Sequence, residues 1–210
     1  ADDAADDAPG EAADGGTDGG PDGGRGLTHG PWDDTELERD EDDVRIDLGC
    51  LLVAPPDGLD LQLQVEEASG EVMAAVLAGQ TGAAELRVFA APRHGDVWES
   101  LRRAVAAEVT RMGGTATEDE GPWGTGVTVQ LDVELEDGQR ATQISRVIGV
   151  PGPRWLLRVT MFGRPAVDFD EQGDVERAVR DLVVVRGSQP FPPGEPLPFT
   201  MPPEARPLGG

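Results

Sequence analysis

Arginine is the residue of this sequence with the clearest chemical potential, because five arginines stand in a stretch that contains no acid. The whole 210-residue chain holds 41 acids and carries a formal net charge of -24, yet none of the acids lies between Gly138 and Val167. The five arginines are Arg140, Arg146, Arg154, Arg158 and Arg164. Guanidinium groups bind carboxylates and phosphates through paired hydrogen bonds, and they stack on aromatic rings. The stretch therefore predicts a surface for an acidic partner or for phosphates.

Two tryptophans complete the candidate binding surface. Its predicted residues are Trp123, Arg146, Arg154, Trp155 and Arg158. The same arginines have a plainer interpretation, which is pairing across a sheet with acids such as Asp132 and Glu134. A third interpretation is nucleic acid, with bases stacked on the tryptophans. The negative net charge weighs against the third, because nucleic-acid binders usually carry a basic domain.

Catalytic motifs do not accompany these arginines. The chain contains no lysine, which excludes Schiff-base chemistry and a phosphate-loop lysine. Cys50 is the one cysteine, which excludes an intramolecular disulfide and a cysteine-based zinc cluster. None of the serines stands in a Gly-x-Ser-x-Gly elbow, and we interpret His94 as a surface residue in a loop. The sequence predicts no catalytic residue, no cofactor and no metal site.

Three consecutive acids form the other group of chemical interest. Glu118, Asp119 and Glu120 stand close to Trp123 in the sequence. If the protein were an enzyme, these carboxylates would be the first residues to change. The glycines and the proline that follow them favour a flexible acidic turn instead.

The arginines and Trp155 must be positioned by the stretch from Gln139 to Phe162, which reads as a β-hairpin. Pro151-Gly152 is expected to close it, because proline followed by glycine matches the central positions of a type II turn. Alternation along the second strand divides its side chains between two faces. One face carries Trp155, Leu157, Val159 and Met161, and the other carries Arg154, Leu156, Arg158, Thr160 and Phe162.

Residues 44–187 are expected to form an α+β domain with a mainly antiparallel sheet of about seven strands, covered by two helices. Period-two alternation and short apolar runs predict strands near 48–53, 59–66, 71–79, 83–91 and 127–135. Asp96 and Glu99 form a capping box before one amphipathic helix, and a second helix is expected near Asp174. The helices could lie on one face of the sheet or on both. A sandwich of the Mog1/PsbP-like kind is the specific fold expected.

Both ends of the chain differ from this domain in composition. Residues 1–43 are rich in Asp, Gly and Ala, and such a segment buries too little apolar surface to offset its ordering entropy, so we expect a disordered acidic tail. Its isolated Trp32 could touch the domain edge, or the acidic segment could fold back on the arginine hairpin. Residues 188–210 contain many prolines and predict an extended tail, whose Phe191 and Leu197 pack along the domain surface.

The hydropathy pattern contains no apolar run of the roughly 18 residues that a membrane span needs. The N-terminus is acidic, whereas a signal peptide begins with basic residues. These features lead us to expect a cytoplasmic protein.

Several short runs resemble an actinobacterial family known as domain of unknown function 3710. The runs are Glu120-Gly-Pro-Trp-Gly124, Ile148-Gly-Val-Pro-Gly-Pro-Arg-Trp-Leu-Leu-Arg158, and Val184-Val-Arg-Gly187 with the Pro-Phe-Pro-Pro that follows. Their order and spacing make the resemblance specific from Gly30 to Pro203. The resemblance implies no activity and no catalytic residues. Genes of the family often lie near those of a dUTP-hydrolysing enzyme and of a small nucleic-acid-binding protein.

Two functional hypotheses follow from these observations. The first is a non-enzymatic cytoplasmic adaptor that binds a protein partner through the arginine hairpin and is regulated by its acidic tail. The second is an accessory factor in nucleic-acid or nucleotide metabolism.

Overall fold

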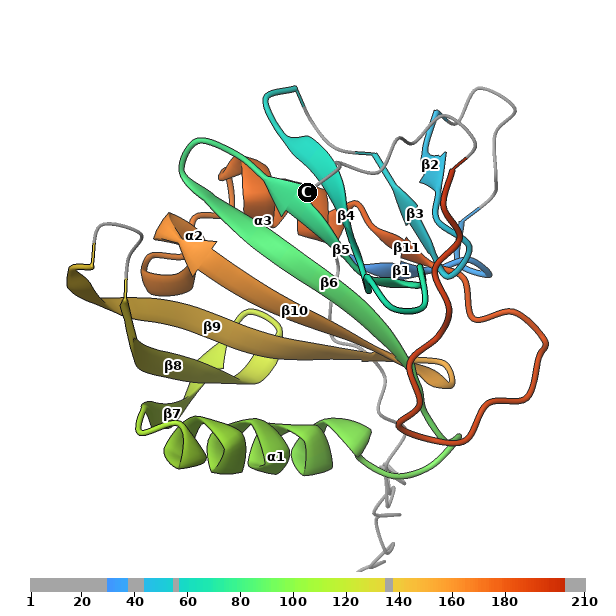
Figure 1. The fold of residues 1–210 in the computed structure, drawn as a ribbon. Coiled ribbons are helices and arrows are strands. Elements are labelled where there is room, and N and C mark those ends of the chain that lie inside the picture. Colours follow the sequence, from blue (N-terminus) through green and yellow to red (C-terminus); the bar gives the residue numbers. More distant parts are fainter. Residues whose placement is uncertain (1–29, 38–43, 55–56, 135–137, 203–210) are drawn as a thin grey trace, which may run out of the picture.

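A computed structural model describes residues 30–37, 44–54, 57–134 and 138–202. This part of the chain forms two β-sheets and three helices (Figure 1). The larger sheet has seven strands, and each strand runs antiparallel to its neighbours. The α+β class and the seven-stranded antiparallel sheet are therefore confirmed. The smaller, four-stranded sheet and a third, short helix were not predicted.

Five hairpins and one longer connection, over residues 91–114 between β6 and β7, build the larger sheet. In their spatial order the strands are β4 (Asp60–Val65), β5 (Val72–Ala78), β6 (Gly82–Ala90), β10 (Trp155–Gly163), β9 (Arg140–Gly152), β8 (Gly124–Glu134) and β7 (Thr115–Gly121). Period-two alternation predicts most of these strands, because each presents apolar side chains to a core.

The alternation along β10 separates two hydrophobic cores, one on each face of the sheet. The larger core contains Trp155, Leu157, Val159 and Met161, which the sequence predicts to share one face, and each of them is at most 1% exposed. Leu156, from the opposite face, joins Phe89 and Val147 in the second core. The sheet is thus covered on both faces over part of its area.

Helix α1 (Val97–Arg111) covers one face beside β7, β8 and β9 (Figure 1). It begins where the sequence predicts, because the Asp96 side chain accepts a hydrogen bond of 3.0 Å from the backbone N–H of Glu99. Trp98 anchors the helix to the sheet by donating from its indole Nε1 to the carbonyl of Thr125 at 2.8 Å. The described helices include none that is long and apolar enough to cross a bilayer.

Two short helices lie against the opposite face, α2 (Arg164–Val167) and α3 (Asp174–Arg180). A buried ion pair joins them: Nη2 of Arg164 lies 2.9 Å from a carboxylate oxygen of Glu176, whose side chain is fully buried. The helix expected near Asp174 is therefore present, but it ends before the strand β11 (Val183–Val184).

The smaller sheet contains a segment that the sequence analysis placed in the disordered tail. Its strands are, in spatial order, β1 (Trp32–Asp33), β11, β3 (Leu51–Val53) and β2 (Ile46–Asp47), with β1 parallel to β11. For residues 30–37 the prediction of disorder is wrong, because Asp33 is buried and accepts a hydrogen bond of 2.6 Å from the Trp155 indole. Residues 1–29 and 38–43 lie outside the described residues.

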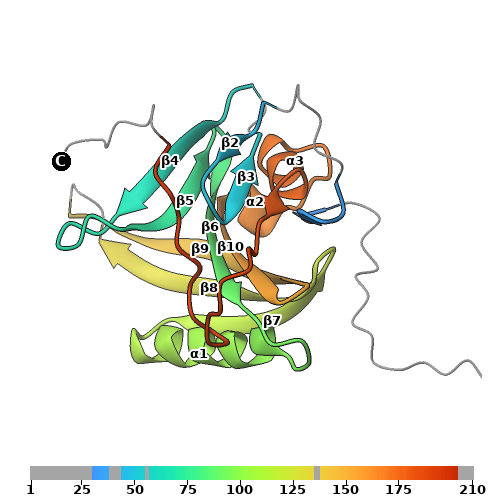
Figure 2. The same ribbon diagram turned by 90° about the vertical axis from the view of Figure 1, so that its right-hand side faces the viewer.

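The proline-rich segment from 188 to 202 runs along the domain, as expected, and connects the two sheets (Figure 2). Its backbone continues the sheet beyond the end of β5: Leu197 donates to the carbonyl of Val88, and Ala90 donates to that of Glu195, both at 2.8 Å. Further along, Thr200 donates to the carbonyl of Leu48 at 2.8 Å. Packing of Phe191 and Leu197 against the larger core is confirmed.

Candidate binding site at the hairpin tip

The β9–β10 hairpin turns at Pro153 and Arg154, so the predicted turn at Pro151-Gly152 is wrong. Gly152 pairs with Trp155, which places both predicted turn residues within the strand. The sequence offers two successive Pro-x pairs, and packing selects between them. A Cβ atom on Gly152 would lie 2.0 Å from the Trp155 indole, so glycine is needed here for close approach of the ring.

Arg154 consequently occupies the turn position that requires a positive φ, and its φ is 62°. Among the described residues it is the one non-glycine residue with this conformation. The left-handed region costs an L residue about 1–2 kcal/mol, and such strain often accompanies function. The Arg154 side chain is exposed at the tip of a long hairpin.

Arg186 holds the hairpin tip in place through hydrogen bonds to backbone carbonyls. Its Nε donates to the carbonyl of Arg154 at 3.0 Å, and its Nη1 donates to the carbonyl of Gln189 at 2.9 Å. The guanidinium also lies 5.4 Å from the centre of the Phe191 ring. Burial, followed by the charge of Arg154, lowers the pKa of Arg186 from its ordinary value. The Arg154 carbonyl accepts a further bond from the backbone of Ala91, so three segments meet at this carbonyl.

The arginines around the tip differ from most others in the described chain. Ion pairs with acids engage Arg87, Arg102, Arg103, Arg111, Arg146, Arg158, Arg164 and Arg177. Five arginines of the described residues have no acid within ion-pair distance: Arg93, Arg140, Arg154, Arg180 and Arg186. Arg93 and Arg154 are exposed. These groups retain their full capacity to bind a carboxylate or a phosphate.

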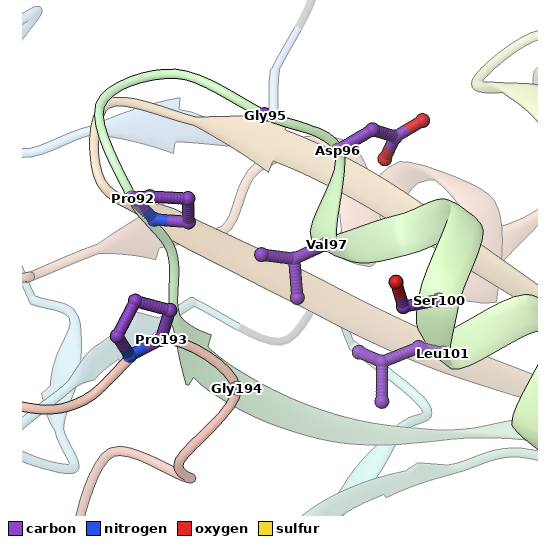
Figure 3. A pocket seen from close by; sticks show the side chains of 8 residues that line it. All are labelled: Pro92, Gly95, Asp96, Val97, Ser100, Leu101, Pro193 and Gly194. Atoms are coloured by element: carbon purple, nitrogen blue, oxygen red, sulfur yellow. The ribbon is translucent and has the colours of Figure 1, made fainter.

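A cavity of about 440 Å³ opens beside the tip, between the start of α1 and the proline-rich segment (Figure 3). Its lining comprises Pro92, Gly95, Asp96, Val97, Ser100, Leu101, Pro193 and Gly194. Most of these side chains are apolar, and the Asp96 carboxylate points away from the two prolines (Figure 3). Arg93 and His94 join Pro92 to Gly95, so the cavity borders the arginine tip. Volumes of this size are typical of sites for small ligands or for one inserted side chain.

Arg158 lies on the α1 side of the sheet, where it and Arg87 share one acid. Its Nη2 is 3.4 Å from Glu85, and Nε of Arg87 is 3.0 Å from the same carboxylate oxygen. The Arg158 guanidinium also lies 5.6 Å from the centre of the Phe89 ring. Burial, followed by the charge of Arg87, lowers the pKa of Arg158. The Arg158 guanidinium is therefore largely engaged by contacts within the fold, and Arg158 is not among the residues that line the cavity.

Arg146 lies on the opposite face of the sheet, so it does not share a surface with Arg158. Its Nη2 is 3.2 Å from the Asp119 carboxylate and 3.5 Å from the carbonyl of Glu120. Cross-strand pairing is therefore its role, as one interpretation of the sequence holds. The partner differs from the expected Asp132, which instead accepts a hydrogen bond from Thr142.

The three consecutive acids lie in β7, and the prediction of a flexible turn is wrong. Strand alternation directs neighbours to opposite faces, where arginines pair with two of the three acids. The Glu120 carboxylate accepts a hydrogen bond from the Thr125 hydroxyl. Glu118 pairs with Arg102 of α1 at 2.9 Å, and Asp119 pairs with Arg146 on the other face. The carboxylates therefore do not converge, and the described residues contain no cluster that could hold a metal ion.

Both predicted site tryptophans belong to the core. Trp155 is 0% exposed and bonds to Asp33, and Trp123 is 8% exposed and packs edge-on against Phe169 at 5.2 Å between ring centres. Both side chains therefore offer little surface to a partner in the folded protein. Of the five predicted site residues, Arg154 is the fully accessible one. Arg186 donates to its carbonyl, and Arg93 stands two residues after Ala91, whose backbone donates to the same carbonyl.

The profile of a family described as "Protein of unknown function (DUF3710)" matches residues 30–207. The chain belongs to this family. The DUF3710 match begins at Gly30, so it includes β1 and the Asp33–Trp155 hydrogen bond. No curated protein matches the chain.

Sequence reasoning missed Arg186, although its Val-Val-Arg-Gly run is one of the motifs that resemble the DUF3710 family. Its bonds to Arg154 and Gln189 are made through backbone carbonyls, which leave no pattern in the sequence. Asp33 was missed for a different reason, because it stands among other acids in a stretch that looks disordered.

Proposed function

We propose that this DUF3710 protein is a non-enzymatic binding module that recognises a protein partner at the hairpin tip. The observation that carries the proposal is the strained, exposed Arg154, held by Arg186 beside an apolar cavity. A partner segment with carboxylates next to one apolar side chain fits these surroundings. The carboxylates pair with Arg154 and Arg93, and the apolar side chain enters between Pro92 and Pro193.

The rigidity of the tip supports this role. The Arg154 carbonyl receives bonds from two other segments, so the turn is positioned before any partner arrives. A pre-organised site loses little conformational entropy on binding. The arginines elsewhere on the hairpin are less suitable, because Arg146 and Arg158 are already paired with acids.

The acidic N-terminal segment is proposed to compete for the same site. Residues 1–29 contain eight acids and one arginine. They join the fold at Gly30, close in sequence to Asp33, which bonds to the neighbour of Arg154. The proposed competition rests on this attachment point and on the negative charge of the segment, which would oppose an acidic partner.

The test uses the full chain and a fluorescently labelled peptide that carries glutamates around one leucine. An Arg93→Ala, Arg154→Ala double variant is expected to lose about fivefold in affinity at low salt, since an exposed ion pair contributes up to about 1 kcal/mol. Arg140→Ala is the matched control, because Arg140 is an exposed arginine at the opposite end of β9. Equal losses in both variants would show a nonspecific charge effect and overturn the proposal.

The competition is tested in the same assay. Changing the eight acids of residues 1–29 to their amides, in the full chain, is expected to raise the affinity for the peptide. Unchanged affinity would remove the regulatory part of the proposal and leave the site itself standing.

Nucleic-acid metabolism is the second proposed function, since the acid-free guanidinium groups of Arg93 and Arg154 suit phosphates as well as carboxylates. It predicts single-strand binding that falls steeply with salt. A labelled single-stranded oligonucleotide that does not bind at low salt would exclude it. We also propose that the helix-covered sheet corresponds to the Mog1/PsbP-like sandwich, a likeness supported by helices on both faces.

A further inference from the structure

Strand β4 is the outermost strand of the larger sheet, and no other described segment pairs with its outward edge. Each paired residue of β4 has its partner in β5. No other backbone hydrogen bond among the described residues reaches β4, and none of its residues has an unprinted partner elsewhere. Alternate backbone N–H and C=O groups of an edge strand point away from the sheet. The edge therefore presents a row of unpaired donors and acceptors.

The opposite edge of the sheet, β7, is protected. It contains Glu118, Asp119 and Glu120 in succession, and α1 lies alongside it. Charges on an edge strand repel an approaching strand, which is a common defence against edge pairing. In β4, by contrast, Asp60 is the one charged residue and stands at the start of the strand. An uncharged edge is notable in a chain with a net charge of -24.

We propose that two copies of this chain associate by antiparallel pairing of their β4 strands, with a two-fold axis at Gln62. In this register Leu61 lies opposite Leu63 of the second copy, and Asp60 lies opposite Gln64. The alternation of β4 is preserved, because half-buried leucines meet leucines while the exposed polar residues meet one another. The two seven-stranded sheets then form one continuous sheet.

Two neighbouring registers are less favourable. An axis at Leu63 places Asp60 opposite Glu66, and two like charges directly opposite destabilise a sheet. An axis between Gln62 and Leu63 places leucine opposite glutamine throughout, which breaks the apolar row along the face that packs against the larger core. The sequence of β4 is thus self-complementary about Gln62. A closed two-fold contact of this kind also uses up the open edge.

Pairing of the β4 strands and peptide binding at the hairpin tip use different surfaces, and we expect them to respond to salt in opposite directions. Two copies with a net charge of -24 each repel one another at low ionic strength. The screening length falls from about 10 Å at 0.1 M to about 3 Å at 1 M. Edge pairing is therefore expected to strengthen with salt, whereas binding of an acidic peptide at the tip weakens.

Cysteine cross-linking of the full chain tests the register. Cys50 is buried and burial raises its pKa to about 12, so it reacts little in the folded protein. A Gln62→Cys variant is expected to form a disulfide-linked dimer rapidly, because the two Cα atoms lie roughly 4.5–5.5 Å apart across the axis. Gln64→Cys is the matched control: in the proposed register its two copies lie roughly 13 Å apart along the strands. Thr117→Cys reports on the exposed β7 edge.

Dimer formation no faster for Gln62→Cys than for the two controls overturns the proposal, and faster reaction of Gln64→Cys overturns the register. Sedimentation velocity supplies the second measurement. The unchanged chain is expected to show a dimer fraction that rises with salt, and a monomer at every salt concentration overturns the proposal.

Charged substitutions of Gln62, the residue at the two-fold axis, distinguish pairing of the β4 edges from any other mode of association. Gln62→Lys and Gln62→Glu are each expected to abolish the dimer, because like charges meet at the axis. An equal mixture of the two variants restores it, because lysine then faces glutamate. Neither substitution disturbs the core, because the Gln62 side chain is exposed. Failure of the mixture to dimerise overturns the proposal.

Discussion

The alkaline stability of this protein is expected to depend mainly on one thiol. Cys50 is 4% exposed, and burial raises its pKa from 9.0 to about 12. The thiol also donates to the carbonyl of Leu197 at 3.8 Å, which only the protonated form can do. The chain contains no lysine and no tyrosine, and its carboxylates are ionised in both states at these pH values. Few other groups therefore titrate between pH 9 and pH 12.

Proton linkage determines how the free energy of unfolding changes with pH. The folded thiol keeps its proton above pH 9, whereas the unfolded thiol loses it, so the unfolded state binds fewer protons. The stabilisation is complete below pH 9 and is lost as the pH rises toward about 12. The free energy of unfolding is expected to fall by about 1.4 kcal/mol per pH unit in this window, or about 4 kcal/mol in total.

Urea unfolding followed by circular dichroism at several pH values measures this slope. Cys50→Ser is the informative variant, because its hydroxyl can still donate to the Leu197 carbonyl but does not titrate in this range. Cys50→Ala controls for the lost donor. Both are expected to show a nearly flat free energy of unfolding between pH 9 and pH 11. An equal slope in the unchanged chain and in Cys50→Ser would refute the reasoning.

Three further predictions concern contacts that hold the site together. Trp155→Phe and Asp33→Ala are each expected to cost about 2–4 kcal/mol of unfolding free energy, because each removes the hydrogen bond between a buried indole N–H and a buried carboxylate. The double variant should cost about 2 kcal/mol less than the sum, and additivity in denaturant unfolding would mean that the bond does not hold β1. Glu176→Gln should cost about 3–5 kcal/mol, because it removes one charge of a buried ion pair. A loss below about 1 kcal/mol in thermal unfolding would show that Arg164 finds another partner. Arg154→Gly should be more stable than Arg154→Ala by about 1 kcal/mol, because glycine relieves the left-handed strain. Equal midpoints in urea would show that the turn is unstrained.

Local sequence patterns predict the larger sheet well. Apolar residues alternate with polar ones along β4 and recur at every second position of β10, so the sequence shows which side chains face a core. The cap of α1 is predictable because Asp96 and Glu99, which form it, are close in the sequence. β7 was missed, because its run of acids reads as a solvated turn. The acids are tolerated in a strand since Arg102 and Arg146, which are distant in sequence, neutralise them on the two faces.

The candidate site was only partly predictable. The sequence singles out the arginine-rich hairpin, and Arg154 at its tip is the residue that stays accessible. It does not reveal that Trp155 is buried, since an aromatic residue next to arginines fits a binding surface and a core equally well. Nor does it reveal Arg186, whose partners are backbone carbonyls.

The sequence by itself determines where strands alternate, where α1 begins and which part of the chain carries unbalanced positive charge. These properties arise from the side chains of close neighbours. The tertiary structure alone decides that the hairpin turns at Pro153 and Arg154, because the Trp155 ring needs Gly152 beneath it. It also decides that β1 belongs to the fold, through a hydrogen bond between residues 122 positions apart. Such contacts form only when the whole chain is packed, because distant residues then share one buried volume.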